Sequence, residues 1–275
     1  MAGLYKYRYR YGHIMIPRPY IIEWRSNAPW RDDAQVEQDL ILSRLIIALF
    51  NEPILADNLC FRGGTALHKL FLTPPVRYSE DIDFVQREAR SIGTVMEKIR
   101  DICNPLLGHP RTKQKKGNVV FVYKVESEIP PLLPLRIKIE INTREHFNVF
   151  NLIDRKYKIE SGWYSGETLI KTYSLEELLA TKLRALYQRK KGRDLFDLWY
   201  ALEQENVDLE KVVFAFKKYM AHMNLRVSSG EYQQNLELKL AEPDFIGDIV
   251  PIIRDGIAFS PESAANVIYP LIKRL

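Results

Sequence analysis

Cysteine is scarce in this chain, because Cys60 and Cys103 are the only two among 275 residues. Two isolated cysteines fit neither a disulfide framework nor a metal site, so we expect both to be small buried hydrophobic residues. Long apolar runs are missing as well, since the longest, Leu45 to Phe50, is far too short to span a bilayer. The N-terminus lacks an apolar signal core. We therefore expect a cytoplasmic protein that does not enter a membrane.

Several catalytic classes lack their signatures in this sequence. The five histidines are scattered without metal-ligand spacing, and no serine or cysteine stands in a hydrolase-like pattern. Internal repeats and low-complexity segments are not visible. Hydrophobic residues make up 46% and charged residues 27%, as in ordinary globular proteins. A sizeable core is expected, in one large domain or two small ones.

Basic charge is concentrated at the N-terminus. The net charge of the chain is +5, and residues 1–31 hold six basic residues against Glu23 alone, so this segment carries the whole excess. Its alternating stretch Tyr5 to Tyr11 offers cations for phosphates and rings for stacking on bases. The same alternation is equally typical of an edge strand with one polar and one aromatic face, and that is the slightly better interpretation of the arm alone.

Hydrophobic periodicity predicts a mixed α/β segment first. Apolar spacing predicts helices over 34–50 and 92–103, the second ending before Pro105, and a short helix after Gly64. Residues 111–117 are expected to form a basic loop. Strands are expected at four positions, namely 59–62, 81–85, 118–126 and 135–141.

The pattern after about Ser174 is mostly helical, with breaks at Gly192, 228–230, Pro243 and 260–261. The fold class we predict is therefore α+β, with the sheet in the N-terminal half and helices in the C-terminal half. We divide the chain into a basic aromatic arm at 1–34, a mixed α/β core at 35–172 and a helical domain at 173–275.

The segment from Ser79 to Phe84 contains paired carboxylates. On a strand, positions i and i+2 share a face, so Asp81 and Asp83 would stand side by side with Ile82 and Phe84 buried behind them. Two adjacent carboxylates repel unless a cation lies between them, and Mg²⁺ prefers such hard oxygen ligands. An isolated Asp-x-Asp is nevertheless more often a solvated strand edge than a metal site.

A third carboxylate is offered by the strand over 135–141. Its isoleucines share one face, while Lys138 and Glu140 share the other. If this strand neighbours the Asp81 strand, Glu140 would complete a set able to hold two metal ions for an in-line phosphoryl displacement. Taken alone, the pattern is better explained as an amphipathic edge strand.

A glycine pair lies between a predicted strand and a predicted helix. Gly63, Gly64 and Thr65 form the start of that helix, where backbone N–H groups and the helix dipole favour a phosphate. A tight turn without a ligand is the simpler explanation of a lone Gly-Gly.

The segment from 174 to 198 is rich in charge. Ser174 opens a helix with a capping box, and the helix carries Lys182 and Arg189 on one face. Gly192 is expected to end it, and a second helix from Arg193 carries Asp197. The cations could neutralise a triphosphate, and Asp197 could orient Lys182 or act as a base. A solvated charged face with Arg193 and Asp197 paired at i, i+4 is the commoner origin of such runs.

The order of these four motifs resembles the nucleotidyltransferase-type AbiEii (AbiEii/AbiGii, MenT-like) toxins of bacterial toxin–antitoxin and abortive-infection systems. The resemblance runs from about residue 35 to the C-terminus. It is carried by four stretches: 61–67 with 77–84, 138–141, 182–189 and 193–198.

This resemblance implies a polymerase-β-like nucleotidyltransferase core at 35–172 followed by a helical domain. It implies that Asp81, Asp83 and Glu140 serve as metal ligands for Mg²⁺ or Mn²⁺, although Lys138 is the alternative functional residue of its motif. An NTP would be bound by residues of all four motifs, and Asp197 would be an essential acid. The residues implied in nucleotide binding are Gly63, Gly64, Thr65, Ser79, Lys182, Arg189 and Arg193.

The resemblance also implies an RNA substrate and a partner protein. Some members of the family add pyrimidine nucleotides to the 3′ end of tRNA and so block translation. The residue matching Ser79 can accept a phosphate when a cognate antitoxin silences the toxin. Transfer to a protein or small-molecule hydroxyl, or a non-catalytic RNA-binding module, are the alternatives.

Overall fold

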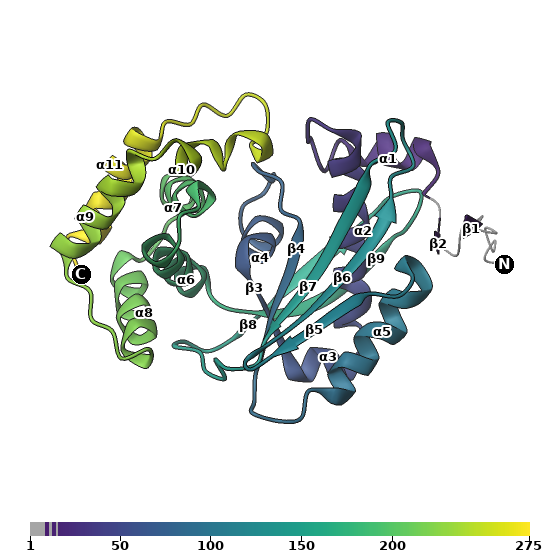
Figure 1. The fold of residues 1–275 in the computed structure, drawn as a ribbon, viewed down its shortest axis with the longest axis horizontal. Coiled ribbons are helices and arrows are strands. Elements are labelled where there is room, and N and C mark those ends of the chain that lie inside the picture. The colour runs from purple at the N-terminus through teal and green to yellow at the C-terminus, as the bar shows by residue number, and fades with distance from the viewer. Residues whose placement is uncertain (1–8, 11–12, 15) are drawn as a thin grey trace.

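The computed structural model describes residues 9–10, 13–14 and 16–275 (Figure 1). Most of the tyrosine-rich stretch over 5–11 lies outside the described residues, so its two interpretations stay open. Two short strands, β1 (Tyr9–Arg10) and β2 (His13–Ile14), pair antiparallel there.

The rest of the predicted N-terminal arm belongs to the folded core. Helix α1 (Arg18–Trp24) buries Ile21 and Trp24, and Trp30 is buried beyond it. The indole Nε1 of Trp24 donates to Asp39 Oδ1 of α2 (Asp33–Phe50) over 3.0 Å. A boundary at residue 34 therefore cuts through packed structure, because apolar side chains between 16 and 34 anchor the segment.

A seven-stranded mixed sheet forms the centre of the described chain. Its strand order is β5-β6-β7-β4-β3-β9-β8, with parallel pairing at β4–β7 and β3–β9 and antiparallel pairing elsewhere. The strands are β3 (Leu59–Arg62), β4 (Asp81–Gln86), β5 (Arg111–Lys115), β6 (Asn118–Glu126), β7 (Pro134–Asn142), β8 (Ile153–Ile159) and β9 (Gly166–Thr172).

The structure differs from the local predictions in several places. Residues 111–115, expected to be a loop, form β5, because they complete a hairpin with β6 around Gly117. The helix expected to end before Pro105 is α5 (Gly93–Leu107), which contains that proline near its C-terminal end. Strands β8 and β9 were not predicted, since their outward positions are charged and only a few residues are buried. Helix α3 (Pro53–Asn58) was also missed because it has only six residues.

The two faces of the sheet pack against different helices. Inward residues such as Phe61, Ile82 and Ile139 join the core formed with α2 and α5. The opposite face contributes Cys60 and Val85 to a second core with α4 (Gly63–Leu70) and the C-terminal helices. Figure 1 shows α4 between the sheet and the helical half. The face that carries Asp81 and Asp83 is therefore the one turned toward α4 and the C-terminal helices.

The C-terminal half is helical, as predicted. The last sheet strand ends at Thr172 and the first helix of this half begins at Leu175. Its helices are α6 (Leu175–Gln188), α7 (Gly192–Gln204), α8 (Leu209–His222), α9 (Ser229–Leu240), α10 (Pro243–Gly247), η1 (Val250–Ile252) and α11 (Pro261–Ile272).

The predicted breaks are helix starts. Ser228 caps α9 with a reciprocal capping box, and Pro243 and Pro261 occupy the first turns of α10 and α11. Gly192 begins α7 and does not end α6, which stops at Gln188. A β-carbon at Gly192 would collide with the backbone oxygen of Phe245, so the glycine permits close packing of α7 on α10.

Both cysteines are free and buried, as expected, and burial raises the thiol pKa of each to about 12. Among the described residues, no helix has the length and apolarity needed to cross a membrane.

Candidate active site

The glycine pair forms a tight passage from β3 into α4. Gly63 has φ +82°, a conformation that favours glycine, and a β-carbon there would collide with the carboxylate of Asp83. A β-carbon at Gly64 would collide with the guanidinium of Arg77. The N-terminus of α4 is thus placed between a carboxylate and a buried cation, and both glycines line the cleft described below.

Asp81 and Asp83 lie on the same face of β4, as predicted. The strand alternates half-buried Asp81 and Asp83 with fully buried Ile82 and Phe84. Burial and then the neighbouring charge of Asp81 raise the pKa of Asp83 to about 6. The pair therefore favours an additional positive charge.

Glu140 lies on the neighbouring strand, as the motif required. The parallel register of β4 with β7 places Asp81 opposite Lys138 and Asp83 opposite Glu140. Lys138 Nζ lies 2.8 Å from Asp81 Oδ2 and 2.9 Å from Glu140 Oε2. Glu140 also accepts a hydrogen bond from Asn118 over 2.7 Å. Lys138 thus bridges two of the three carboxylates.

This bridge affects how the carboxylates can hold a metal. Burial opposes the charge on Lys138, but its hydrogen bonds and ion pairs with Asp81 and Glu140 raise its pKa above the usual range. In the described part of the chain, no three His, Cys, Asp or Glu side chains converge as a metal site. Asp81 and Asp83 are hard oxygen donors beside one another, and their chemistry suits Mg²⁺ or Mn²⁺ completed by water and phosphate. Glu140 is occupied by Lys138 and Asn118.

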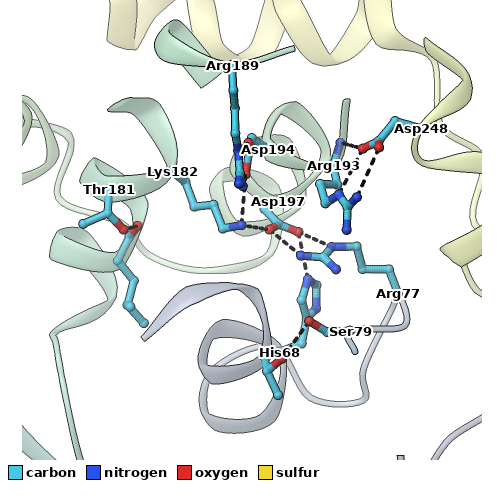
Figure 2. A network of polar contacts seen from close by, with 12 residues as sticks. His68, Arg77, Ser79, Thr181, Lys182, Arg189, Arg193, Asp194, Asp197 and Asp248 are labelled. Carbon is cyan, nitrogen blue, oxygen red and sulfur yellow. Dashed lines mark hydrogen bonds and ion pairs between the residues drawn. The ribbon is translucent and has the colours of Figure 1, made fainter. Parts of the chain in front are cut away.

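Asp197 of α7 is the centre of a buried ion network (Figure 2). Arg77 donates to both of its oxygens over 2.6 and 2.7 Å, and Lys182 Nζ lies 2.8 Å from Oδ2. His68 Nε2 lies 2.8 Å from Oδ1 and must be the donor, because a carboxylate only accepts. Burial alone would raise the pKa of Asp197, but Arg77, Lys182 and His68 hold it well below the usual range.

These contacts distinguish the two predicted roles of Asp197. A general base needs a free oxygen and a pKa near the working pH, and Asp197 has neither. It instead orients Lys182 and Arg77. His68 is held neutral, because burial and then the charge of Arg77 lower its pKa to about 4.

Asp194 and Asp248 hold the remaining cations of the third and fourth motifs. Asp194 is buried and lies 3.0 Å from Lys182, and it accepts a fork of hydrogen bonds from Arg189. Arg193 pairs with Asp248 over 3.1 Å and not with Asp197. The simple i, i+4 pair expected for a solvated helix face is therefore not formed, because Asp197 points into the protein.

Ser79 lies over the glycine turn. Its hydroxyl is 2.8 Å from that of Thr65, and Thr65 also donates to the backbone oxygen of Asp81. Ser79 lines the cleft and is half-buried, whereas the Thr65 side chain is fully buried. The threonine hydroxyl supports Ser79 and β4, so only its backbone N–H can serve a phosphate.

Several cleft residues were missed by sequence reasoning. Arg77 stood within the quoted motif but was given no role, and burial beside Asp197 is a tertiary property. Glu145 joins Arg62 and Arg184 at 2.9 and 2.6 Å, and these two arginines also line the cleft. Arg62 directly precedes the glycine pair, and Arg184 follows Lys182 by two residues, so their motif context was the available signal.

All these elements enclose one cleft of about 520 Å³ between the sheet and α6–α7. It brings together the paired aspartates, the glycine turn and the cations of α6 and α7. Four carboxylates and eight basic side chains line it. The acidic residues are Glu80, Asp81, Asp83 and Glu140, and the basic ones are Arg62, Arg77, Lys138, Lys182, Arg184, Arg189, Lys191 and Arg193. Such a cleft can hold a polyanion at one side and a divalent cation at the other.

Comparison with known proteins agrees with this chemistry. The family model described as nucleotidyl transferase AbiEii toxin, type IV toxin–antitoxin system, matches residues 44–262. The chain belongs to the AbiEii family. It is therefore a nucleotidyltransferase of a toxin–antitoxin family, as its motifs predicted.

Solved structures confirm the fold of this AbiEii protein. MenT4, a nucleotidyltransferase toxin from Mycobacterium tuberculosis H37Rv, is similar with a TM-score of 0.62 and 18% identity over 95% of this chain and 91% of that chain. JHP933 from Helicobacter pylori is similar with a TM-score of 0.54 and 17% identity, covering 88% of this chain and 93% of that chain. No curated protein sequence matches.

Proposed function

We propose that this AbiEii protein transfers a nucleoside monophosphate from an NTP to the 3′ hydroxyl of an RNA, with the 3′ end of tRNA as the acceptor. The observation that carries the proposal is the cleft itself, in which paired aspartates face a glycine turn and a set of cations held in fixed positions. Modified tRNA would block translation, and this would explain the toxicity of such a protein.

Asp81 and Asp83 are proposed to hold the metal, Mg²⁺ or Mn²⁺. When bound, such an ion supplies charge neutralisation for the attacking and leaving oxygens. The raised pKa of Asp83 and its closeness to Asp81 support this assignment, because a divalent cation relieves the repulsion between two partly buried carboxylates. Glu140 can join only when Lys138 releases it.

The triphosphate is proposed to lie between the glycine turn and α6–α7. The N–H groups of Gly63 and Gly64 are at the N-terminus of α4, where a phosphate is favoured. Lys182, Arg189 and Arg193 approach from the other side, each held by an aspartate. Fixed cations reduce the reorganisation needed as negative charge develops in the transition state.

The reaction balances without a further reagent. The 3′ oxygen of the RNA bonds to the α-phosphorus of the NTP, and the bond from that phosphorus to the bridging oxygen breaks. Pyrophosphate leaves with the bond electrons, and the hydroxyl proton passes to solvent.

Ser79 is proposed as a site of regulation by phosphorylation, with a cognate antitoxin as partner. Its hydroxyl is half-buried in the cleft beside Gly64 and two residues from Asp81. A phosphate adds between 1.5 and 2 negative charges at neutral pH, roughly. Placed here it would occupy the position of an NTP phosphate and repel the incoming nucleotide. Ser79→Ala should resist this silencing.

A transfer assay tests the main proposal. The purified protein is incubated with Mg²⁺, a tRNA pool and each of the four labelled NTPs in turn. We expect labelled tRNA, and sequencing of RNA 3′ ends after brief expression should show the added nucleotide. Asp81→Ala should abolish labelling. Asp154→Ala is the matched control, because Asp154 is an exposed strand aspartate that also pairs with a lysine.

Retained labelling in Asp81→Ala would contradict the mechanism. Labelling of a protein or a small molecule with none on RNA would contradict the acceptor and favour the alternative hydroxyl. The family assignment disfavours a non-catalytic RNA-binding module, and transfer to any acceptor would exclude it.

A further inference from the structure

A second hollow lies on the open face of the sheet, beside the cleft. It has a volume of about 810 Å³ and spans β5, β6 and β7. We call it the basic groove and define it by its five cations. These are Arg111, Lys113, Lys124, Arg136 and Lys138.

The strand register places these cations in rows. Arg111 is opposite Val122 of β6, and Val122 is in turn opposite Lys138 of β7. Lys124 is opposite Arg136 in the same ladder. Side chains two residues apart on a strand are about 6.6 Å apart, close to the distance between successive phosphates of a nucleic-acid strand. The half-buried side chains of Val120 and Val122 on β6 form the bottom of the groove, and the charged ends of the lysine and arginine side chains extend above them.

Four of the five groove cations, all except Lys138, differ from the cations of the cleft in lacking carboxylate partners. Within the described residues, Arg111, Lys113, Lys124 and Arg136 form no ion pair, and all four are exposed. Among the described residues that line the groove there is no carboxylate. Glu126 is next along the same face of β6, and Glu140 stands opposite Val120 at the β7 side of the groove, where Lys138 and Asn118 already contact it. The groove therefore offers uncompensated positive charge to an outside ligand.

The opposite edge of the sheet shows that this is not a general property of the strands. On β8, Lys156 pairs with Glu167 over 2.9 Å, and Lys158 pairs with Glu160. These two lysines are also exposed and two residues apart. The same residue types are thus neutralised at the β8 edge and left unpaired at the β5 edge, whose groove shares Lys138 with the cleft.

Lys138 connects the groove to the chemistry, because it lines both hollows and contacts Asp81. We propose that the basic groove binds the phosphate backbone of the RNA acceptor and directs its 3′ end past Lys138 to the paired aspartates. This inference rests on the proposed function, since it assumes that the acceptor is RNA.

An acidic protein is the competing occupant, and the groove favours RNA over it. Protein interfaces usually rely on buried aromatic or large apolar anchors, and no phenylalanine, tyrosine or tryptophan is among the described residues that line this groove. Regularly spaced cations above a smooth floor bind a repeating charge and do not require a particular side chain.

The test compares two double variants of the full chain. Arg111→Gln with Lys113→Gln removes two groove charges on edge strand β5. Lys156→Gln with Lys158→Gln removes two charges at the same spacing on edge strand β8. Binding to tRNA is measured by fluorescence anisotropy at several salt concentrations, without NTP or divalent metal. Nucleotide affinity serves as a check that both variants are folded.

We expect the β5 variant to bind RNA about tenfold more weakly than the wild type. The slope of log affinity against log salt concentration should become shallower by about 1.4, because two phosphate contacts are lost and each contributes about 0.7. Its KM for RNA should rise by a similar factor with NTP affinity unchanged. The β8 variant should match the wild type in all of these measurements.

Equal RNA affinity in the wild type and the β5 variant would overturn the inference. The inference would also be overturned if the β5 variant bound RNA normally but was no longer neutralised by the antitoxin. The groove would then be a protein-docking surface. Failure of the proposed function is a separate result, because then the wild type labels no RNA. A labelled RNA with an unchanged KM in the β5 variant refutes the groove alone.

Discussion

Two groups of aspartates in this molecule have opposite electrostatic environments. Asp81 and Asp83 stand on β4, where Lys138 is the one cation among the described residues that pairs with Asp81, and the pKa of Asp83 is raised to about 6. Asp194 and Asp197 on α7 are fully buried, yet paired cations lower the pKa of both. Burial alone would raise the pKa in each group, so the number of cationic partners makes the difference.

This difference separates reactive groups from positioning groups. A carboxylate pair short of positive charge gains most from binding a divalent cation. A carboxylate whose oxygens are already filled by arginine and lysine holds those cations in place. The four motifs therefore contribute two groups of residues that meet in one cleft. One is the proposed metal site on the sheet, and the other is a set of cations held in place on the helices.

The largest expected effect is on catalysis. Asp83→Asn should reduce nucleotide transfer by at least about 10³-fold, roughly 4 kcal/mol in activation free energy, because a proposed metal ligand is lost. In metal-free buffer the same variant should be no less stable than the wild type, since a repelled charge is removed. Transfer assays and urea denaturation measure the two effects. If the Asp83→Asn protein were active but strongly destabilised, the paired aspartates of β4 would have a structural role and not the catalytic one assigned to them.

The next largest effect is on stability. Asp197→Asn leaves Arg77 and Lys182 buried with too little compensating charge, so we expect a loss of about 3–5 kcal/mol in the free energy of unfolding. Asp248→Asn is the comparison variant, because its partners Lys191 and Arg193 are partly exposed. It should lose no more than about 1 kcal/mol. Equal losses in urea denaturation would mean that burial of the network contributes little.

The buried network should also respond to acid. The pKa of His68 is about 4 in the folded state and about 6.5 when exposed, so between these values the unfolded chain binds a proton that the folded chain does not. Stability should therefore fall by on the order of 3 kcal/mol as the pH drops from 6.5 to 4. His68→Gln keeps a donor for Asp197 without this titration. The stability difference between wild type and variant, measured against pH, should follow that decline, and a flat difference would contradict it.

The smallest expected effect concerns Lys138 and Glu140. Lys138→Met removes the cation that competes for Asp81, so half-maximal thermal stabilisation by Mg²⁺ should require a several-fold lower concentration. Glu140→Gln should change that concentration less than about threefold, because Glu140 already contacts Lys138 and Asn118. A tenfold higher requirement in Glu140→Gln would establish Glu140 as a direct metal ligand.

Sequence reasoning succeeded where a motif is local. The side-by-side placement of Asp81 and Asp83 follows from the two-residue period of a strand. The glycine pair indicated the passage from strand to helix, although α4 begins at Gly63 and not after the glycines. The helical second half follows from apolar periodicity. The neighbouring position of Glu140 was stated as a condition, and the β4–β7 register met it.

Sequence reasoning failed where partners are distant in the chain. Arg77 and Asp197 are 120 residues apart in the sequence, and Arg193 and Asp248 are 55 residues apart. Nothing near Asp197 indicates that its oxygens are filled by residues from the N-terminal half. Residues 111–115 are too charged to suggest a strand, because only the pairing with β6 defines β5.

The sequence by itself determined the kinds of groups present and their local order: paired aspartates, a glycine turn, a Lys–Glu strand and a basic helix pair. It could do so because strand and helix periods act over a few residues. The tertiary structure alone decided which carboxylates are short of positive charge, which are neutralised, and that an unpaired basic groove continues from the cleft. Electrostatic roles depend on neighbours within a few ångströms, and in this fold those neighbours come from segments that are far apart along the chain.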